Sequence, residues 1–161
     1  MYRLRELSGE TVSIHIPYGG NRLCIAELKS EKEIIYTAGI GSMAPIYVGA
    51  ASKVLLAYMP EQKRNLLLQK IFAGNDKDMA IDKNKLLKEI QETAEKGYAF
   101  SFGERIYGSA CLAVPILAKN EAIAALCILG PSFRLTKTEL EKLVPHIKEE
   151  ATIIEESLGS N

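Results

Sequence analysis

Two apolar runs near the middle of the chain limit most strongly what this sequence can fold into. Residues 110–117 contain no charged side chain, and neither do residues 122–129. Only the four residues 118–121 separate the two runs, which favours an antiparallel hairpin because parallel strands need a much longer connection. Strands as apolar as these are covered on both faces. The sequence therefore predicts that this hairpin lies at the centre of a sheet with helices packed against it.

Shorter patterns predict the remaining strands. Residues 11–16 alternate apolar and polar side chains, as in a strand with one face buried and one in solvent. Residues 22–28 follow after a glycine-rich turn and form its hairpin partner. A third strand is predicted over residues 33–37, and another over residues 98–102. The fold class expected is therefore α+β, with one antiparallel sheet.

Helical spacing accounts for most of the other segments. A helix is predicted from Ala51 to Tyr58, a second from Pro60 to residue 72 ending at Gly74, and a third after the cap residue Asp82. This third helix is expected to end at Gly97, and residues 75–82 are expected to form a loop.

The last helix is predicted to follow Thr136, which with Glu139 has the spacing of a capping box. Pro145 lies inside this helical pattern. Because proline removes a backbone donor, we expect it to kink the helix or divide it.

Composition excludes several functional classes. The 161 residues suffice for one globular domain, and 20 basic residues balance 20 acidic ones, so the net charge does not favour contact with DNA. No apolar run approaches the roughly 20 residues that span a bilayer, and the N-terminus lacks a signal sequence, which predicts a cytoplasmic protein. The paired glycines lack the spacing of a phosphate-binding loop. We therefore expect no nucleotide cofactor.

The three cysteines, Cys24, Cys111 and Cys127, lie in apolar segments and are predicted to be reduced core thiols. A two-residue turn at 119–120 would place Cys111 and Cys127 on opposite faces of the hairpin, whereas a three-residue loop would place them on one face with Leu129. Periodicity alone favours two core cysteines without a shared role.

The two histidines, His15 and His146, are predicted to be solvent-side residues, because no carboxylate lies at dyad or metal-ligand spacing from either. Glu104, Arg105 and Tyr107 fall in a predicted loop, where capping or solvation is the commoner role.

Four small residues, Gly49, Ala50, Ala51 and Ser52, open the first predicted helix. Small side chains there permit close packing of the helix on a sheet. They also let an anion approach the unpaired N–H groups of the first turn. The pattern by itself does not choose between these two interpretations.

Several segments, in order, resemble the C-terminal effector-binding domain of the IclR family of bacterial transcriptional regulators. Residues 45–57 resemble its Pro-x7-Lys-x-Leu-Leu-Ala segment, residues 97–104 its Gly-Tyr-x4-Gly-Glu segment, and residues 130–134 its Gly-Pro-x-x-Arg segment. The resemblance covers nearly the whole chain. It implies a GAF-like fold, in which a curved antiparallel sheet carries helices on both sides and a small-molecule pocket.

The resemblance also implies a domain plan. Residues 1–9 would be the end of a linker helix and residues 10–161 the effector-binding domain, while the N-terminal winged helix-turn-helix domain that binds DNA is absent from this chain. The expected role is ligand sensing and self-association to a dimer or tetramer in a repressor-type regulator. No enzymatic activity, cofactor, metal or membrane partner is implied.

Carried over to this sequence, the family's effector site implies seven residues. They are Gly49, Ala50, Ala51, Ser101, Cys111, Cys127 and Leu129. Cys127 and Leu129 stand where hydroxyl side chains are common, so a very polar ligand would leave its own polar groups unpaired. We therefore expect a carboxylate with an apolar body.

Two alternatives remain at this stage. One is a GAF-like enzyme that uses Cys111 as a redox or nucleophilic thiol, although no neighbouring base or cation is visible in the sequence. The other is a metal site formed by Cys111, Cys127 and a histidine, for which the residues are widely scattered.

Overall fold

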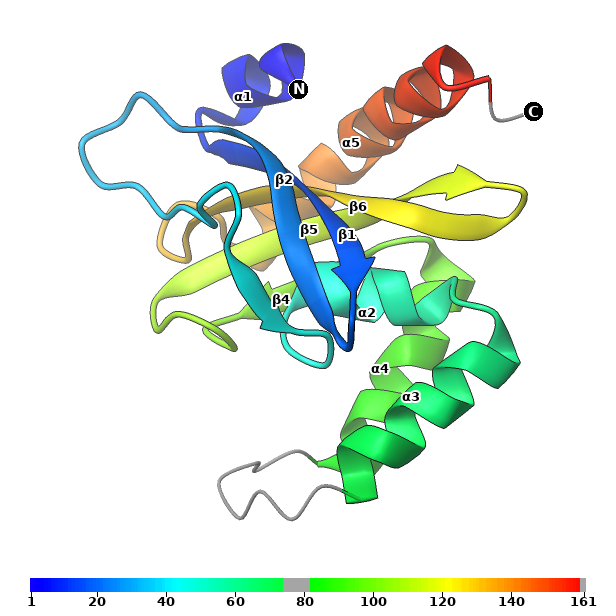
Figure 1. The fold of residues 1–161 in the computed structure, drawn as a ribbon. Helices are drawn as coiled ribbons and strands as arrows, with labels where there is room; N and C mark the ends of the chain where they lie inside the picture. The colour runs from blue at the N-terminus through cyan, green and yellow to red at the C-terminus, as the bar shows by residue number, and fades with distance from the viewer. Residues whose placement is uncertain (74–81, 160–161) are drawn as a thin grey trace.

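A computed structural model describes residues 1–73 and 82–159. It contains one antiparallel sheet of six strands in the order β3-β2-β1-β6-β5-β4 (Figure 1). The strands are β1 (Thr11–Tyr18), β2 (Asn21–Leu28), β3 (Met43–Pro45), β4 (Ala99–Phe102), β5 (Ser109–Ala118) and β6 (Glu121–Pro131). The helices are α1 (Tyr2–Ser8), α2 (Ala50–Ala57), α3 (Glu61–Ala73), α4 (Lys83–Lys96) and α5 (Lys137–Ser157). The predicted α+β, GAF-like fold is confirmed.

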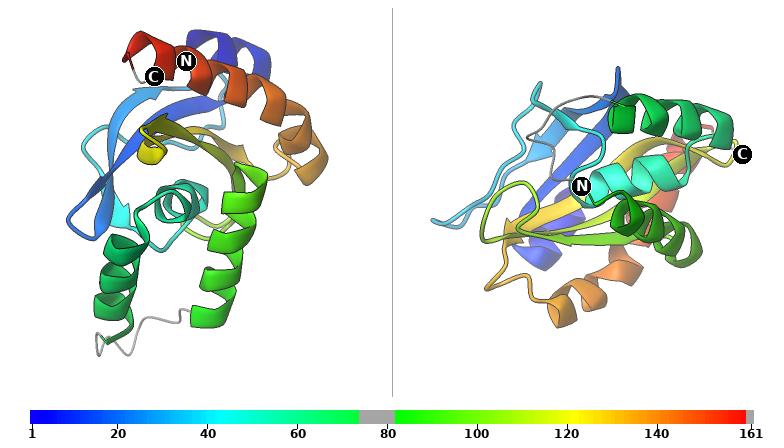
Figure 2. Two further views of the ribbon diagram at one scale, coloured as in Figure 1. Left: turned by 90° about the vertical axis from the view of Figure 1, so that its right-hand side faces the viewer. Right: turned by 90° about the horizontal axis from the view of Figure 1, so that it is seen from below.

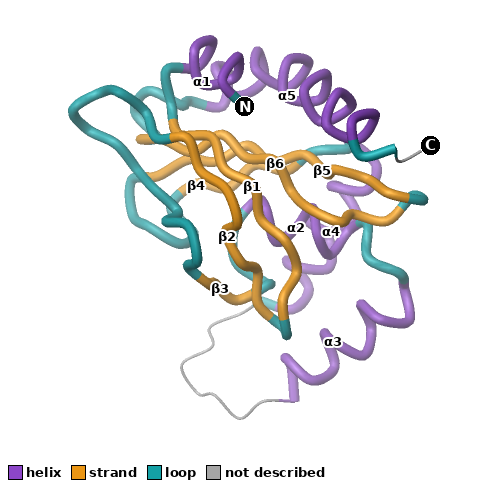
Figure 3. Tube along the Cα trace, turned by 45° about the horizontal axis from the view of Figure 1, so that its top comes forward, coloured by secondary structure: helices purple, strands orange, loops and turns teal. Residues whose placement is uncertain are grey.

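The sheet is curved, with α1 and α5 on one side and α2, α3 and α4 on the other (Figures 1 and 2). The tube in Figure 3 shows that α2 lies directly beneath the central strands. Both apolar runs are largely buried, as predicted, but Ile123 in the second run is exposed. Their side chains alternate between two clusters: Leu112 and Leu126 pack toward α5, whereas Ala113 and Cys127 pack against α2. No helix in the described part of the chain is long and apolar enough to cross a membrane.

The predicted strand over residues 33–37 is absent, and the short β3 pairs with β2 instead. Side chains from other segments hold this stretch of backbone. The Glu27 carboxylate accepts hydrogen bonds from the amides of Ala38 and Gly39, and Arg134 donates to the carbonyl oxygen of Ile34. A short alternation of apolar and polar residues does not show that distant side chains, rather than a neighbouring strand, will bond to the backbone.

The ends of the helices follow the predicted signals in most cases. Asp82 accepts a hydrogen bond from the amide of Lys85, and Gly97 ends α4 in a left-handed conformation. Thr136 caps α5 by accepting from the amide of Glu139. The predicted end at Gly74 and loop over 75–82 lie outside the described residues, apart from residue 82.

Of the two effects expected of Pro145, a kink or a division of the last helix, the division does not occur. The helix α5 is continuous through Pro145 and contains 21 residues. Packing explains this result, because Leu140, Ile147 and Ala151 on both sides of the proline belong to the same buried cluster. Their burial offsets the backbone hydrogen bond that proline removes.

The hairpin of β5 and β6 has a two-residue turn. Ala118 pairs with Glu121, and the intervening Lys119 and Asn120 both have left-handed backbone conformations, with φ of 50° and 66°. Two such residues fit the twist of a tight hairpin. With regular pairing, this turn would place Cys111 and Cys127 on opposite faces.

A β-bulge changes that outcome. Leu117 pairs with Ala122 but Ile116 pairs with Ala124, so Ile123 is an extra residue on β6. The one-residue shift exchanges the faces of every side chain beyond it.

Beyond the bulge, Cys111 lies opposite Leu129, and Cys127 lies opposite Ala113. The two cysteines and Leu129 therefore face the same side of the sheet. The expectation that only a loop with an odd number of residues could achieve this was wrong, because a two-residue turn followed by a bulge has the same effect.

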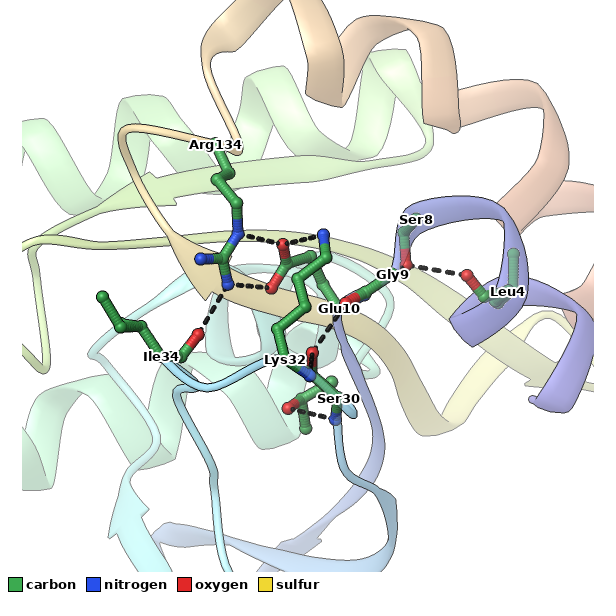
Figure 4. Close-up of polar contacts among 9 residues, drawn as sticks. Leu4, Ser8, Gly9, Glu10, Ser30, Lys32, Ile34 and Arg134 are labelled. Atoms are coloured by element: carbon green, nitrogen blue, oxygen red, sulfur yellow. Dashed lines mark hydrogen bonds and ion pairs between the residues drawn. The ribbon is translucent and has the colours of Figure 1, made fainter.

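A buried ion cluster joins the end of α1 to the segment after β6 (Figure 4). The side chain of Glu10 is 1% exposed, and it accepts from Arg134 Nε at 2.6 Å, from Arg134 Nη2 at 3.0 Å and from Lys32 Nζ at 2.9 Å. We call these three residues the Glu10 clamp. Gly130 lies so close that an added Cβ would come within 2.5 Å of Glu10 Oε2. A side chain at position 130 would displace the Glu10 carboxylate. The clamp therefore requires glycine at this position of β6.

Candidate functional site

A cavity lies between the α2 side of the sheet and the loop that joins β4 to β5. It contains about 450 Å³ of space free of protein atoms, part of which is open to solvent. The part in which a water-sized sphere can be centred is only about 30 Å³, so the cavity is narrow. The seven residues that the family resemblance implied all line it, namely Gly49, Ala50, Ala51, Ser101, Cys111, Cys127 and Leu129.

Sequence reasoning missed several polar residues of the same cavity. They are Ser13, His15, Arg22, Arg105 and Ser109. The alternation in β1 contained a usable signal: β1 pairs with the central strand β6, so its polar face also lies within the covered sheet. The interpretation of that face as solvated was therefore wrong. A strand next to the centre of a sheet with helices on both sides has both of its faces covered.

His15 is the clearest correction. It was expected in solvent, but it is only 3% exposed and lines the cavity, while His146 is exposed as expected. Burial is the main cause that lowers the pKa of His15 to about 3, and the positive charges of Arg22 and Arg105 lower it further. The ring is therefore neutral at physiological pH.

The hydrogen bonds of His15 define its tautomer. Arg22 Nη1 lies 3.0 Å from Nδ1, and because a guanidinium can only donate, Nδ1 is the acceptor. Nε2 then carries the hydrogen and donates it to Ser13 Oγ, also at 3.0 Å. Since the Ser13 hydroxyl accepts this bond, its own hydrogen is free to point at a ligand.

Arg22 is buried at 6% exposure and extends from β2 to the start of α2. Its Nε donates to Ser52 Oγ at 3.1 Å, and its Nη2 lies 3.6 Å from the position that a Cβ on Gly49 would occupy. Its hydrogen-bond partners, Ser52 and His15, are both neutral. A buried cation with neutral partners keeps most of its desolvation cost unless an anion approaches.

The start of α2 is held in place by the loop after β4. The Glu104 carboxylate accepts from the amide of Gly49 at 3.0 Å and from the buried ammonium of Lys53. Gly49 has a positive φ of 87°, which fits the glycine at this position. Glu104 is therefore the acceptor for the Gly49 amide. The amides of Ala50 and Ala51 lie in the first turn of α2, where N–H groups have no acceptor within the helix.

The two cavity thiols differ in acidity, and His15 does not act as a base for either of them. A hydrogen bond from Cys127 lowers the pKa of Cys111, but burial opposes this shift, and the pKa of Cys127 is raised by its bond to Cys111 and by burial. Both ring nitrogens of His15 are occupied by Arg22 and Ser13, so this imidazole does not serve either thiol as a base. Among residues 1–73 and 82–159, no group of three His, Cys, Asp or Glu side chains could hold a metal ion.

The neutral state of His15 predicts a loss of stability in mild acid. An unfolded histidine takes up a proton near pH 6.5, whereas the folded ring does so only near pH 3. The stability is therefore complete above pH 6.5 and falls as the pH falls toward 3. We expect the free energy of unfolding to drop by about 2 kcal/mol between pH 8 and pH 5.

Urea denaturation at a series of pH values measures this loss. His15→Gln should remove most of the slope, and the control His146→Gln, in an exposed position, should retain it. An equal slope in the wild type and in His15→Gln would contradict the buried neutral state.

The family model described as "Bacterial transcriptional regulator IclR C-terminal" matches residues 1–156. This chain belongs to the IclR family. The match covers the whole sheet and nearly all of α5, so the cavity described above lies in an IclR C-terminal domain.

Similar proteins agree with this assignment. The HTH-type transcriptional repressor AllR of Escherichia coli (strain K12) is 30% identical over 161 residues, which cover 99% of this IclR-family chain and 59% of AllR. The crystal structure of the Thermotoga maritima IclR has a TM-score of 0.87 at 25% identity and covers 98% of this chain and 65% of its own. The C-terminal domain of the E. coli transcriptional regulator KdgR has a TM-score of 0.82 at 25% identity, covering 99% and 93%. The chain spans about 59% of the length of the curated relatives it matches.

Proposed function

We propose that this IclR-family domain binds a small organic carboxylate with an apolar body in the cavity, and that binding changes the affinity of the full-length cytoplasmic regulator for DNA. The observation that carries the proposal is the buried Arg22 beside the first turn of α2. Its guanidinium has neutral partners, and the amides of Ala50 and Ala51 add partial positive charge at the same place. A carboxylate would satisfy both.

The apolar body of the ligand would contact Cys111, Cys127 and Leu129. These side chains line one side of the cavity. The family resemblance implies that Cys127 and Leu129 replace hydroxyl side chains, which would otherwise bind polar groups of a ligand. The Ser13 hydroxyl and Ser101 line the same cavity and would help to orient the acid. Catalysis is not part of the proposal, since both ring nitrogens of His15, the histidine of the cavity, are engaged by Arg22 and Ser13.

The route from the cavity to DNA would run through β1. Ser13 and His15 line the cavity, and the same strand begins directly after α1 and the Glu10 clamp. In the domain plan that the resemblance implies, α1 leads to the DNA-binding domain, and dimers or tetramers combine several such units. A ligand that favours one position of β1 would thereby favour one arrangement of the DNA-binding domains.

Isothermal titration of the purified domain with butyrate and its neutral analogue butyramide tests the need for a negative charge. We expect butyrate to bind at least about tenfold more tightly, because only the acid offers a charge to Arg22. Equal affinities would contradict the proposed carboxylate site. Glyoxylate, a very small polar acid, should bind more weakly than butyrate, and the reverse order would contradict the apolar body.

A further inference from the structure

Two of the residues that line the cavity are ionised, and both are arginines. Arg22 comes from β2 and Arg105 from the loop between β4 and β5. The third titratable base of the lining, His15, is neutral. The cavity therefore has two positive charges on its surface, whereas a simple monocarboxylate brings one negative charge.

Neither guanidinium forms an ion pair within the described residues, although other cations of the domain do. The buried Lys53 is matched by Glu104 and Glu89, and Arg134 is matched by Glu10. Arg22 and Arg105 thus differ from Lys53 and Arg134, whose charges are neutralised by carboxylates of the domain.

Two acids near the cavity are partly or fully engaged elsewhere. Glu104 is held by Lys53 and by the Gly49 amide. Glu27 attracts Arg105 electrostatically, and its Oε2 is fixed by the amides of Ala38 and Gly39, while its buried Oε1 has no hydrogen-bond partner among the described residues. These contacts leave the charge of Arg22 uncompensated and that of Arg105 only weakly compensated.

The two arginines line the same cavity from different elements. Arg22 is buried beside the start of α2, and Arg105 is an exposed residue of the loop. Burial lowers the pKa of Arg105, and the positive charge of Arg22 lowers it further. An anion between them would relieve the repulsion between these two charges.

We infer that the ligand of this cavity is a small organic dianion, with one acidic group at Arg22 and the start of α2 and a second acidic group at Arg105. A short apolar spacer between the two groups would contact Cys127 and Leu129. This inference rests on the proposed carboxylate site, and adds to it the second charge and the role of Arg105 in selecting the ligand.

Matched acids separate the second charge from the size of the ligand. Succinate and butyrate have the same number of carbon atoms, as do glutarate and pentanoate, and within each pair only the first is a diacid. By isothermal titration of the domain we expect each diacid to bind at least about tenfold more tightly than its monoacid. The preference should shrink as the salt concentration rises, because Arg105 is exposed.

Arg105→Gln should bring the ratio of diacid to monoacid affinity close to one. Lys88→Gln is the matched control, since it removes one positive charge from an exposed position on α4 and should retain the preference. Equal binding of diacid and monoacid to the wild type overturns the inference, as does a preference that survives in Arg105→Gln.

The same titrations distinguish failure of the proposed carboxylate site from failure of the second acidic group. If butyrate binds and succinate gains nothing, the carboxylate site stands and the second acidic group is refuted. If none of the four acids binds, both the site and the inference are refuted.

Discussion

Replacing Arg134 with methionine is expected to lower the free energy of unfolding by about 3 kcal/mol. The substitution retains an apolar stem but removes the guanidinium that holds both oxygens of Glu10. Since Glu10 is 1% exposed, its carboxylate would remain buried with Lys32 as its one charged partner among the described residues. Urea denaturation monitored by circular dichroism measures the difference.

Two further variants separate this effect from the loss of any surface ion pair. Arg3→Gln removes the exposed pair with Glu149 and a longer contact of 3.5 Å with Glu150, which keeps the N-terminal ammonium as a partner, and should cost less than about 1 kcal/mol. The double variant Glu10→Leu with Arg134→Met should recover part of the loss, because no buried charge then remains unpaired. A cost for Arg134→Met as small as that for Arg3→Gln would show that the clamp contributes little.

Ala50→Leu is expected to weaken binding of the proposed carboxylate at least about 100-fold, which corresponds to about 2.7 kcal/mol. Ala50 is 1% exposed and lines the cavity at the first turn of α2. Three additional carbon atoms there would occupy the space that an anion needs to reach the helix amides. Titration with the acid that binds the wild type best measures the effect.

Ala57→Leu is the matched control for this substitution. It makes the same change at the other end of α2, where Ala57 packs against a different cluster beside α3. Both variants should remain folded, with a modest loss of melting temperature from overpacking. Affinity that is unchanged in Ala50→Leu would show that the ligand does not sit at the start of α2.

The parts of the fold that depend on long, regular patterns could be predicted from the sequence. The two central apolar runs predicted the paired strands β5 and β6, and the cap residues Asp82 and Thr136 marked the starts of two helices. These signals are local, so no knowledge of the tertiary structure is needed to interpret them. The seven residues implied by the family resemblance line one cavity, and their role in binding remains a prediction.

The parts that failed depend on contacts between distant segments. Residues 33–37 have a strand-like sequence, but Glu27 and Arg134 supply the partners for the nearby backbone. The bulge at Ile123 decides which face Cys127 occupies, and nothing in the local sequence distinguishes that residue from its apolar neighbours. Arg22 could not be placed because its partners, His15 and Ser52, come from two other elements.

The bulge at Ile123 also has a consequence for how the ligand can change in evolution. Because it corrects the parity of the hairpin, the odd-numbered residues beyond the bulge face the α2 side of the sheet, and Ser13, Cys111 and Cys127 among them line the cavity. Even-numbered residues, such as Val12 and Leu126, form the core under α5. Cavity positions such as Ser13 and Cys111 can then vary with the chemistry of the ligand without changing the cluster under α5. A change of specificity therefore need not disturb the packing of the last helix.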